Sequence, residues 1–177
     1  VMNYLFAGPT IAFAAGPCVQ RAQVEGRDYI ATPPLSARQY TRVIDDLLQL
    51  YDWPIQLTQL NLFDSHDTAR LLTIAGGDRA SVRLATLLLL TFPGAPAIFY
   101  GDEIGLPGGI DPDARRTMPW DRPDTWDLAT LTYHKQLIAL RRALPALRTG
   151  AMRHLYADDA VYGFARALAD EIVVVAV

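Results

Sequence analysis

The chain has 177 residues, 51% of them hydrophobic and 20% charged, a globular composition long enough for one sizeable core or for a domain and part of a second. Its net charge is −3, with 16 basic and 19 acidic residues, and no basic run is longer than a pair. This balance argues against a surface for nucleic acid or for an anionic membrane, so we predict neither as a partner.

The longest uncharged stretch, residues 84–101, does not predict a membrane span. The segment from Pro93 to Pro96 divides it into a helix end and a short apolar strand, each too short to cross a bilayer. The chain opens without a signal-peptide pattern and closes on the apolar run 172–177, so we expect both ends to be internal to a longer protein.

The first third of the chain predicts two short strands on either side of a long helix. Residues 1–6 form an apolar strand candidate, and residues 17–33 show no clear periodicity. A helix-start signal at Ser36 then opens an amphipathic helix, whose apolar positions recur every three or four residues up to Tyr51. Residues 60–63 form a brief strand that runs directly into polar side chains.

The middle of the chain predicts two helices and a buried strand. A helical stretch from Thr68 is closed by a pair of glycines, and Asp78 is a suitable N-cap for a deeply buried helix over residues 79–92. The apolar residues 97–100 are expected to form a fully buried strand.

A long irregular loop and a final helix lead into a β segment. Glycine and proline punctuate the loop, and Asp124 or Thr125 is expected to cap a helix that reaches about Leu144. From residue 153 onward the apolar positions lose helical spacing, and residues 172–175 are a continuous β-branched run. We therefore expect a second, β domain to begin near residue 149.

The alternation of strands and helices predicts an α/β fold with a parallel sheet and right-handed crossovers. The carboxyl ends of parallel strands share one face, so residues that follow different strands converge there. His66 and Asp67 follow one strand, Asp102 and Glu103 follow the next, and the loop beyond carries Asp111 and Arg115. These side chains are the candidates for a functional site.

Each of these groups also has a purely structural explanation. Asp64, Ser65 and Asp67 are suitable turn and N-cap residues for the helix that follows them. Asp102 and Glu103 at the base of a loop are suited to a structural ion pair with a nearby arginine, the interpretation we slightly favour for that pair. Asp111 and Arg115, taken alone, are typical of a solvated loop pair.

Metal binding and thiol chemistry are weaker alternatives. His66 lies among several carboxylates, but no paired-histidine spacing supports a divalent metal, so we predict no metal and no cofactor. Nothing around Cys18, the single cysteine, suggests activation, and a lone cysteine is more often a small core residue.

Three segments together resemble the α-amylase family of glycoside hydrolases. Residues 62–70, LFDSHDTAR, are similar to its fourth signature segment, and residues 91–106, TFPGAPAIFYGDEIGL, resemble its eighth barrel strand and the approach to it. Residues 111–120, DPDARRTMPW, are similar to the loop that follows. Residues 1–4, VMNY, resemble the sixth strand in the branch of neopullulanases, cyclomaltodextrinases and maltogenic amylases.

The resemblance implies a (β/α)8 barrel, followed by a β-sandwich, that cleaves α-glucosidic bonds with retention. Asp67 matches the third acidic residue of the family, which holds hydroxyls of the sugar at the cleavage point and favours its distorted form. His66 matches a histidine that hydrogen-bonds the same sugar. Asp111 and Arg115 match a pair that contacts sugars on the non-reducing side.

The resemblance also implies that the catalytic machinery is incomplete in this chain. A retaining glycosidase needs a nucleophile and a general acid roughly 5 Å apart, and the family carries both after strands four and five. The chain resembles the family only from strand six onward. Residues 1–148 are therefore predicted to be strands 6 to 8 of the barrel, and residues 149–177 the truncated start of the β domain.

Several functional interpretations stay open at this stage. The parent protein is predicted to hydrolyse maltodextrins, cyclodextrins or pullulan, while a transglycosylating relative and a sugar-binding remnant are the alternatives. The branch favours a cytoplasmic location, and calcium binding by the parent is undecided. Open barrel edges predict a partner besides the α-glucan substrate: the complementary N-terminal part of the same enzyme or another copy of this chain.

Overall fold

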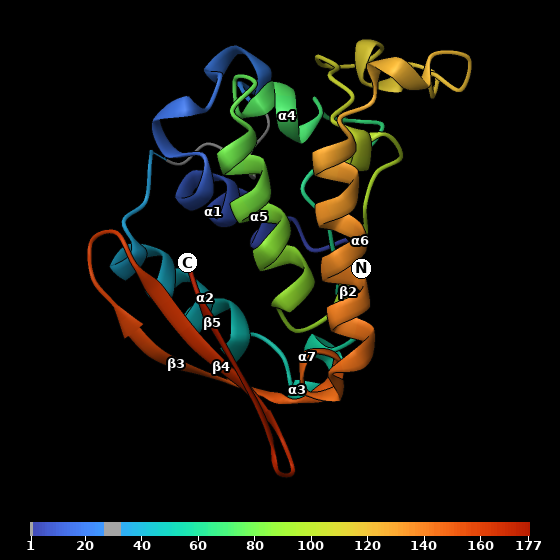
Figure 1. The fold of residues 1–177 in the computed structure, drawn as a ribbon. Helices are drawn as coiled ribbons and strands as arrows, with labels where there is room; N and C mark the ends of the chain where they lie inside the picture. The colour runs from blue at the N-terminus through green and yellow to red at the C-terminus, as the bar shows by residue number, and fades with distance from the viewer. Residues whose placement is uncertain (1, 27–32) are drawn as a thin grey trace.

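A computed structural model describes residues 2–26 and 33–177 (Figure 1). Position 1 of the predicted first strand and residues 27–32 of the predicted aperiodic segment lie outside the described residues. The helices are α1 (Tyr4–Ala14), α2 (Ala37–Gln49), α3 (Trp53–Gln56), α4 (Leu71–Ile74), α5 (Arg79–Thr91), α6 (Leu128–Ala143) and α7 (Pro145–Thr149). The strands are β1 (Leu60–Asn61), β2 (Ala95–Pro96), β3 (Ala151–Ala157), β4 (Tyr162–Leu168) and β5 (Glu171–Ala176). Short 3-10 turns lie at Gly16–Cys18, Arg21–Gln23, Asp102–Ile104, Asp113–Arg115 and Pro123–Thr125.

Two sheets confirm the expected α/β character. Strands β1 and β2 pair in parallel, with Leu60 opposite Ala95, and Met2 forms an isolated parallel bridge to Leu60. Strands β3, β4 and β5 form an antiparallel sheet in that order. Figure 1 shows α5 and α6 standing side by side and α1 behind α5, with the antiparallel sheet against the end of the molecule that holds α2.

The predicted strand over residues 1–6 is wrong beyond Met2, because α1 begins at Tyr4. The side chain of Asn3 caps this helix by accepting a hydrogen bond from the Phe6 amide over 3.2 Å. The apolar pattern of this segment serves the helix, since Phe6 is completely buried and stacks on Phe92 at 4.5 Å between ring centroids.

The predicted buried strand over residues 97–100 is also wrong. The parallel pairing falls at Ala95 and Pro96, and one further amide, that of Ala97, donates to the Asn61 carbonyl. The chain then leaves the sheet, and Tyr100 is 43% exposed. A run of apolar residues gives no information on where a short strand finds its hydrogen-bonding partner.

The starts of two helices differ from the predictions. The stretch from Thr68 becomes helical only at Leu71, because residues 65–68 close a turn of their own. Helix α6 begins at Leu128, and Asp127, rather than Asp124 or Thr125, caps it by accepting from the amides of the two residues after Leu128. The helices that begin after Ser36 and Asp78 are confirmed, each with the expected side-chain cap.

The antiparallel sheet shares one hydrophobic cluster with the helices. Tyr162 on β4 meets Tyr40 of α2 edge to face at 5.4 Å, and Phe164 and Val175 belong to the same buried cluster as Phe6. The predicted boundary near residue 149 therefore crosses a continuous core. Among the described residues, none of the helices combines the length and the apolar character needed to cross a bilayer.

Candidate functional site

The loop between β1 and α4 presents His66 and Asp67 outward. The Ser65 amide donates to the Thr68 hydroxyl over 2.9 Å, and the Asp67 amide donates to the Ser65 hydroxyl over 3.2 Å. These bonds close a tight turn, so the side chains at its tip point away from the core. The Asp67 side chain is 62% exposed, and that of His66 is similarly open to solvent.

The four predicted site residues lie together in the structure. Arg115 donates through Nη2 to Asp67 Oδ1 over 3.4 Å and through Nε to Asp111 Oδ1 over 2.6 Å. His66 Nε2 lies 3.3 Å from the same Asp67 oxygen. The fold therefore joins a loop that follows β1 to a loop that follows β2, and Arg115 is the bridge. We call Asp67, His66, Asp111 and Arg115 the rim cluster.

The capping interpretation holds for Asp64 and not for Asp67. The Leu71 amide donates to Asp64 Oδ2 over 2.6 Å, so this carboxylate serves the start of α4. The Asp67 carboxylate instead accepts a hydrogen bond from Arg115, on the other loop. Asp67 is therefore the acidic group of this loop that remains open to a ligand.

The predicted ion pair with a nearby arginine is borne out for Asp102, whereas Glu103 bonds to a main-chain amide. Asp102 Oδ1 lies 3.2 Å from Nη1 of the buried Arg70, and Glu103 accepts a hydrogen bond from the Gly101 amide. Neither carboxylate belongs to the rim cluster. The strand ends do converge on one side of the molecule, but this acidic pair lies beneath the rim.

Asp64 and Asp102 form a buried carboxyl pair joined by a side-chain hydrogen bond. Burial raises the pKa of Asp102 well above its usual range, and the charge of Asp64 raises it further. Burial also raises the pKa of Asp64, against hydrogen bonds from Asp102 and from the Leu71 amide. The ionised form of Asp102 is therefore disfavoured beside Asp64, and the charge of Arg70 acts in the opposite direction by lowering the pKa of both carboxyl groups.

Arg70 lies within the motif of residues 62–70 but was not among the residues predicted for the site. Arginine is rarely fully buried without partners, and nothing in the local pattern distinguishes it from a solvated helix-start residue. The available signal was its position between two loops rich in acidic and glycine residues. In the structure its side chain has no exposed surface.

The weaker alternatives gain no support. Within residues 2–26 and 33–177, no group of three or more histidine, cysteine, aspartate or glutamate side chains is arranged to hold a metal ion. Cys18 is a free, partly buried thiol in a short 3-10 turn. The residues of the rim cluster instead offer carboxylates, an imidazole and a guanidinium, the groups that hydrogen-bond to sugar hydroxyls.

Known protein sequences and solved structures are similar to this chain over most of its length. A family model described as "Alpha amylase, catalytic domain" matches residues 18–137. The cyclomaltodextrinase of Geobacillus thermopakistaniensis is 44% identical over 133 residues, covering 75% of this chain and 22% of that protein. Neopullulanase 2 of Thermoactinomyces vulgaris is 38% identical over 175 residues, covering 97% and 27%. The solved debranching enzyme of Nostoc punctiforme superposes with a TM-score of 0.95 and 61% identity, over 99% of this chain and 36% of that one.

The chain belongs to the α-amylase family of glycoside hydrolases, which confirms the resemblance seen in its motifs. It spans between 22% and 27% of the length of these two curated relatives and 36% of the Nostoc structure. The described residues are thus one part of what a protein of this family contains.

Proposed function

We propose that the protein containing this chain is a retaining glycoside hydrolase acting on the α-glucosidic bonds of maltodextrins, cyclodextrins or pullulan. The bonds are α-1,4-linked and, as the name of the Nostoc debranching enzyme suggests, α-1,6-linked as well. The observation that carries this proposal is the rim cluster, in which an open Asp67 carboxylate lies between His66 and Arg115.

The cluster suits an oxocarbenium-like transition state. Hydrogen bonds from ring hydroxyls to Asp67 strengthen as positive charge develops on the sugar, and they lower the barrier by several kcal/mol. The negative charge of Asp67 favours the same state electrostatically. His66 is placed to bond a hydroxyl of the same sugar, while Asp111 and Arg115, further along the rim, are placed to hold the next sugars.

We infer that the nucleophile and the general acid come from outside residues 1–177. The neighbouring carboxyl groups of Asp64 and Asp102 lie beneath the rim, where Asp102 accepts from the buried Arg70 and Asp64 accepts from the Leu71 amide. They are in no position to attack a sugar. Met2, β1 and β2 would then correspond to strands six, seven and eight of a (β/α)8 barrel, and β3–β5 to the start of a β-sandwich.

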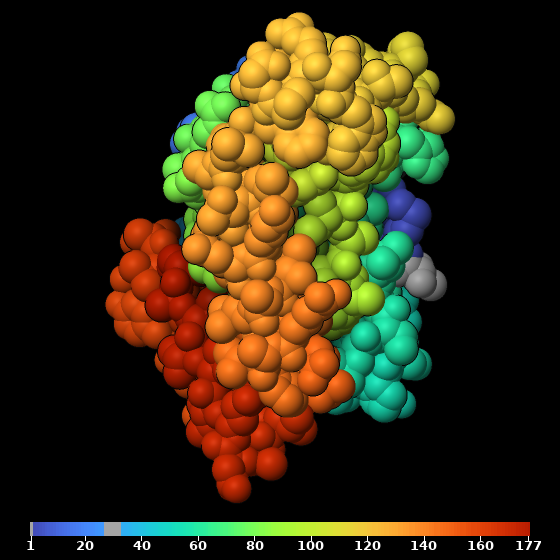
Figure 2. Space-filling model, turned by 45° about the vertical axis from the view of Figure 1, so that its right-hand side comes forward, coloured from blue at the N-terminus to red at the C-terminus, as the bar shows by residue number. Residues whose placement is uncertain are grey.

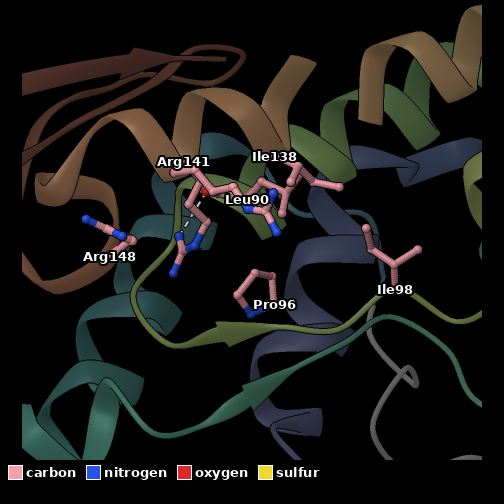
Figure 3. Close-up of a pocket in the computed structure, with 7 residues that line it drawn as sticks. Leu90, Pro96, Ile98, Ile138, Arg141 and Arg148 are labelled. Carbon is pink, nitrogen blue, oxygen red and sulfur yellow. Dashed lines mark hydrogen bonds between the residues drawn. The ribbon is translucent and has the colours of Figure 1, made fainter. Parts of the chain in front are cut away.

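The barrel interpretation also implies that the free side of β2 is covered in the complete protein. Within the described residues, β2 pairs with β1 alone. Beside it lies an open cavity of about 340 Å³, and Figure 3 shows Leu90, Ile98 and Ile138 around it. We propose that another part of the same protein, or a second copy of this chain, covers this edge. Light scattering and mass spectrometry of purified residues 1–177 should reveal that partner. If the sample is a monodisperse 19.5 kDa monomer that unfolds cooperatively, the proposal is contradicted.

The function is tested by hydrolysis of maltoheptaose, cyclodextrin and pullulan. The complete protein should release α-anomeric products, and its Asp67→Asn variant should be almost inactive, whereas Asp121→Asn on the neighbouring loop should keep its activity. Residues 1–177 alone should show no turnover above background. Turnover by this chain that disappears in Asp67→Ala would refute the placement of the nucleophile and acid elsewhere.

The same assays distinguish the two alternatives. Products in which a glucosyl unit has been transferred to another sugar would support a transglycosylating enzyme. Sugar binding by the complete protein without any turnover would support a non-catalytic, sugar-binding protein.

A further inference from the structure

Arg70 is a cation enclosed entirely by protein. Its side chain has no exposed surface, although it follows the exposed Asp67 by three residues. Nε donates to the Ala114 carbonyl over 3.0 Å, and Nη1 donates to the Tyr100 carbonyl over 2.6 Å and to Asp102 Oδ1 over 3.2 Å. One guanidinium thus binds the loop that follows β2 and the loop that carries the 3-10 turn at Asp113–Arg115.

The main chain of Arg70 adds a further link. Its amide donates to the Gly108 carbonyl over 2.9 Å, at the start of the loop that leads to Asp111 and Arg115. A Cβ atom at Gly108 would lie 3.1 Å from Arg70 Cδ and 2.9 Å from the Asp113 carbonyl oxygen, so only glycine lets the loop approach this closely. Tyr100, Gly108 and Ala114, which are all distant from Arg70 in sequence, therefore meet at this residue.

Aromatic rings fix the plane of the guanidinium. The ring centroids of Phe99 and Tyr100 lie 4.4 Å and 4.8 Å from Arg70 Cζ. Stacking on the two rings and donation to fixed carbonyls together leave the planar fork a single orientation. A lysine at this position would keep the charge, but its single ammonium group cannot donate to all three of these acceptors at once.

The carboxyl groups of Asp64 and Asp102 balance the buried charge of Arg70. Asp102 accepts from Arg70, and Asp64, bonded to Asp102, holds the other end of the turn through the Leu71 amide. The turn that presents Asp67 is therefore anchored on both sides, at Asp64 and at Arg70. Nη2 of Arg70 is buried without a hydrogen-bond partner among the described residues. The hydrogen bonds of Nε and Nη1 therefore fix the orientation of the guanidinium.

We propose that Arg70 is a positioning residue that sets Asp67 against Arg115. Each end of the Asp67–Arg115 ion pair lies close to Arg70 along the chain: the turn that presents Asp67 ends two residues before Arg70, and Arg115 follows Ala114, whose carbonyl accepts from Arg70. The effect on catalysis rests on the proposed function, because the position of Asp67 against Arg115 affects the reaction only if the rim cluster binds the sugar.

The test compares Arg70→Lys with Arg166→Lys in the complete protein. Arg166 is a matched control because it is also fully buried and also donates to main-chain carbonyls, those of Thr91, Leu147 and Gly150, away from the rim cluster. A displacement of about 1 Å is enough to cost roughly 100-fold in rate. We expect Arg70→Lys to lower kcat/KM for maltoheptaose by about tenfold or more, measured well below the melting temperature, and Arg166→Lys to leave kcat/KM nearly unchanged.

A double-mutant cycle separates positioning from general loosening. If Arg70 acts by placing Arg115 beside Asp67, the effect of Arg70→Lys should shrink to about threefold or less in an Arg115→Ala background. Equal losses with and without Arg115 would overturn the proposal. An equal loss from Arg166→Lys would overturn it as well, because any disturbance of a buried arginine would then suffice.

A measurement without substrate distinguishes this proposal from the proposed function. The Nε–H NMR signal of Arg115, identified by its absence in Arg115→Lys, reports the bond to Asp111. It should shift and broaden in Arg70→Lys and stay in place in Arg166→Lys, and an unchanged signal in Arg70→Lys would overturn the positioning role. A complete protein that hydrolyses none of the α-glucans would refute the proposed function, while this signal would still decide the role of Arg70.

Discussion

Arg115 and Asp67 are 48 residues apart in sequence, yet Arg115 Nη2 donates to Asp67 Oδ1 over 3.4 Å. The side chains are 50% and 62% exposed, so water screens the pair and it contributes little to stability. Figures 1 and 2 show that the loop of residues 105–125 gathers at one end of the molecule, opposite the antiparallel sheet. The pair therefore joins two loops at one end, where a ligand can reach both side chains.

The first prediction separates the roles of these two residues in the complete protein. Asp67→Asn should lower kcat by roughly 100-fold or more, because its charge acts on the transition state. Arg115→Ala should mainly raise KM for longer oligosaccharides, with a smaller fall in kcat because Asp67 loses its ion-pair partner. Steady-state kinetics on maltotriose and maltoheptaose measure both effects.

The neighbouring Arg116 provides the control for that experiment. Arg116 pairs with Asp113 in the same loop through two hydrogen bonds, and neither residue belongs to the rim cluster. Arg116→Ala should leave both kinetic constants close to those of the unaltered protein, and both arginine variants should change stability by less than about 1 kcal/mol. Small and equal effects of Asp67→Asn and Arg115→Ala would show that the site lies elsewhere.

The second prediction concerns the buried carboxyl pair. Asp102→Asn keeps an acceptor toward Arg70 and a donor toward Asp64, and it removes a carboxyl group whose pKa burial raises well above the ordinary value of 3.8. A group with a raised folded-state pKa contributes fully below its unfolded pKa and loses that contribution as the pH rises through the folded value. The melting temperature of Asp102→Asn relative to the unaltered protein should therefore increase from about pH 4 to about pH 8.

Two comparisons sharpen this second prediction. His134 lines the same small cavity as Asp64 and Asp102, and burial lowers its pKa, but it is present in both proteins and cancels in the difference. Asp102→Ala removes the same carboxyl group but also the acceptor toward Arg70, so it should be less stable than Asp102→Asn and cost about 3 kcal/mol or more. A stability difference between Asp102→Asn and the unaltered protein that does not vary with pH would contradict a raised pKa of Asp102.

Local signals account for the elements that the sequence predicted well. Ser36 and Gln39 form a capping box, and the Asp78 side chain accepts from the amides of Ala80 and Ser81. Both helix starts depend on residues within three positions of each other, which a linear pattern can represent. The motif of residues 62–70 likewise identified the turn of Asp67, and the convergence of strand ends on one face correctly placed Arg115 near it.

The errors arose where distant residues decide the local structure. Asn61 accepts from the Ala97 amide, and its side chain donates to the Pro93 carbonyl, so pairing with β1 places β2 at Ala95 and Pro96. Burial of Arg70 likewise depends on carbonyls 30 and 44 residues away. Hydrophobic periodicity describes which face a segment buries and carries no information on such partners.

The third prediction concerns the start of α6. Asp127 accepts from the amides of Ala129 and Thr130 and pairs with Arg79, and the Thr130 amide is the main reason that its pKa falls to about 2. Asp127→Ala should cost about 1 kcal/mol at neutral pH through loss of the cap. Urea unfolding monitored by circular dichroism measures this loss.

The pH dependence of Asp127→Asn tests the same cap electrostatically. A lowered folded-state pKa gives a stabilising contribution above the unfolded value of 3.8, and that contribution is lost as the pH falls through about 2. The unaltered protein should therefore be more stable than Asp127→Asn above about pH 4 and should lose that advantage by about pH 2. Asp124→Asn, on the exposed turn before the helix, should show no such gap, and a constant gap for Asp127→Asn would disprove the electrostatic account.

The last prediction concerns Arg166, which ties the antiparallel sheet to the helices. From β4, Arg166 donates to the carbonyls of Thr91 at the end of α5, Leu147 in α7 and Gly150. Arg166→Met should cost about 3 kcal/mol or more, because three buried acceptors lose their donor. Since Tyr162 and Phe164 share a cluster with the helices, the loss should appear equally in both parts. Hydrogen exchange followed by mass spectrometry should show peptides of β4 and α5 opening with the same free energy in the unaltered protein and falling together in the variant. Early exchange of the sheet alone would instead mean that residues from about 149 onward form a separate domain, as the sequence predicted.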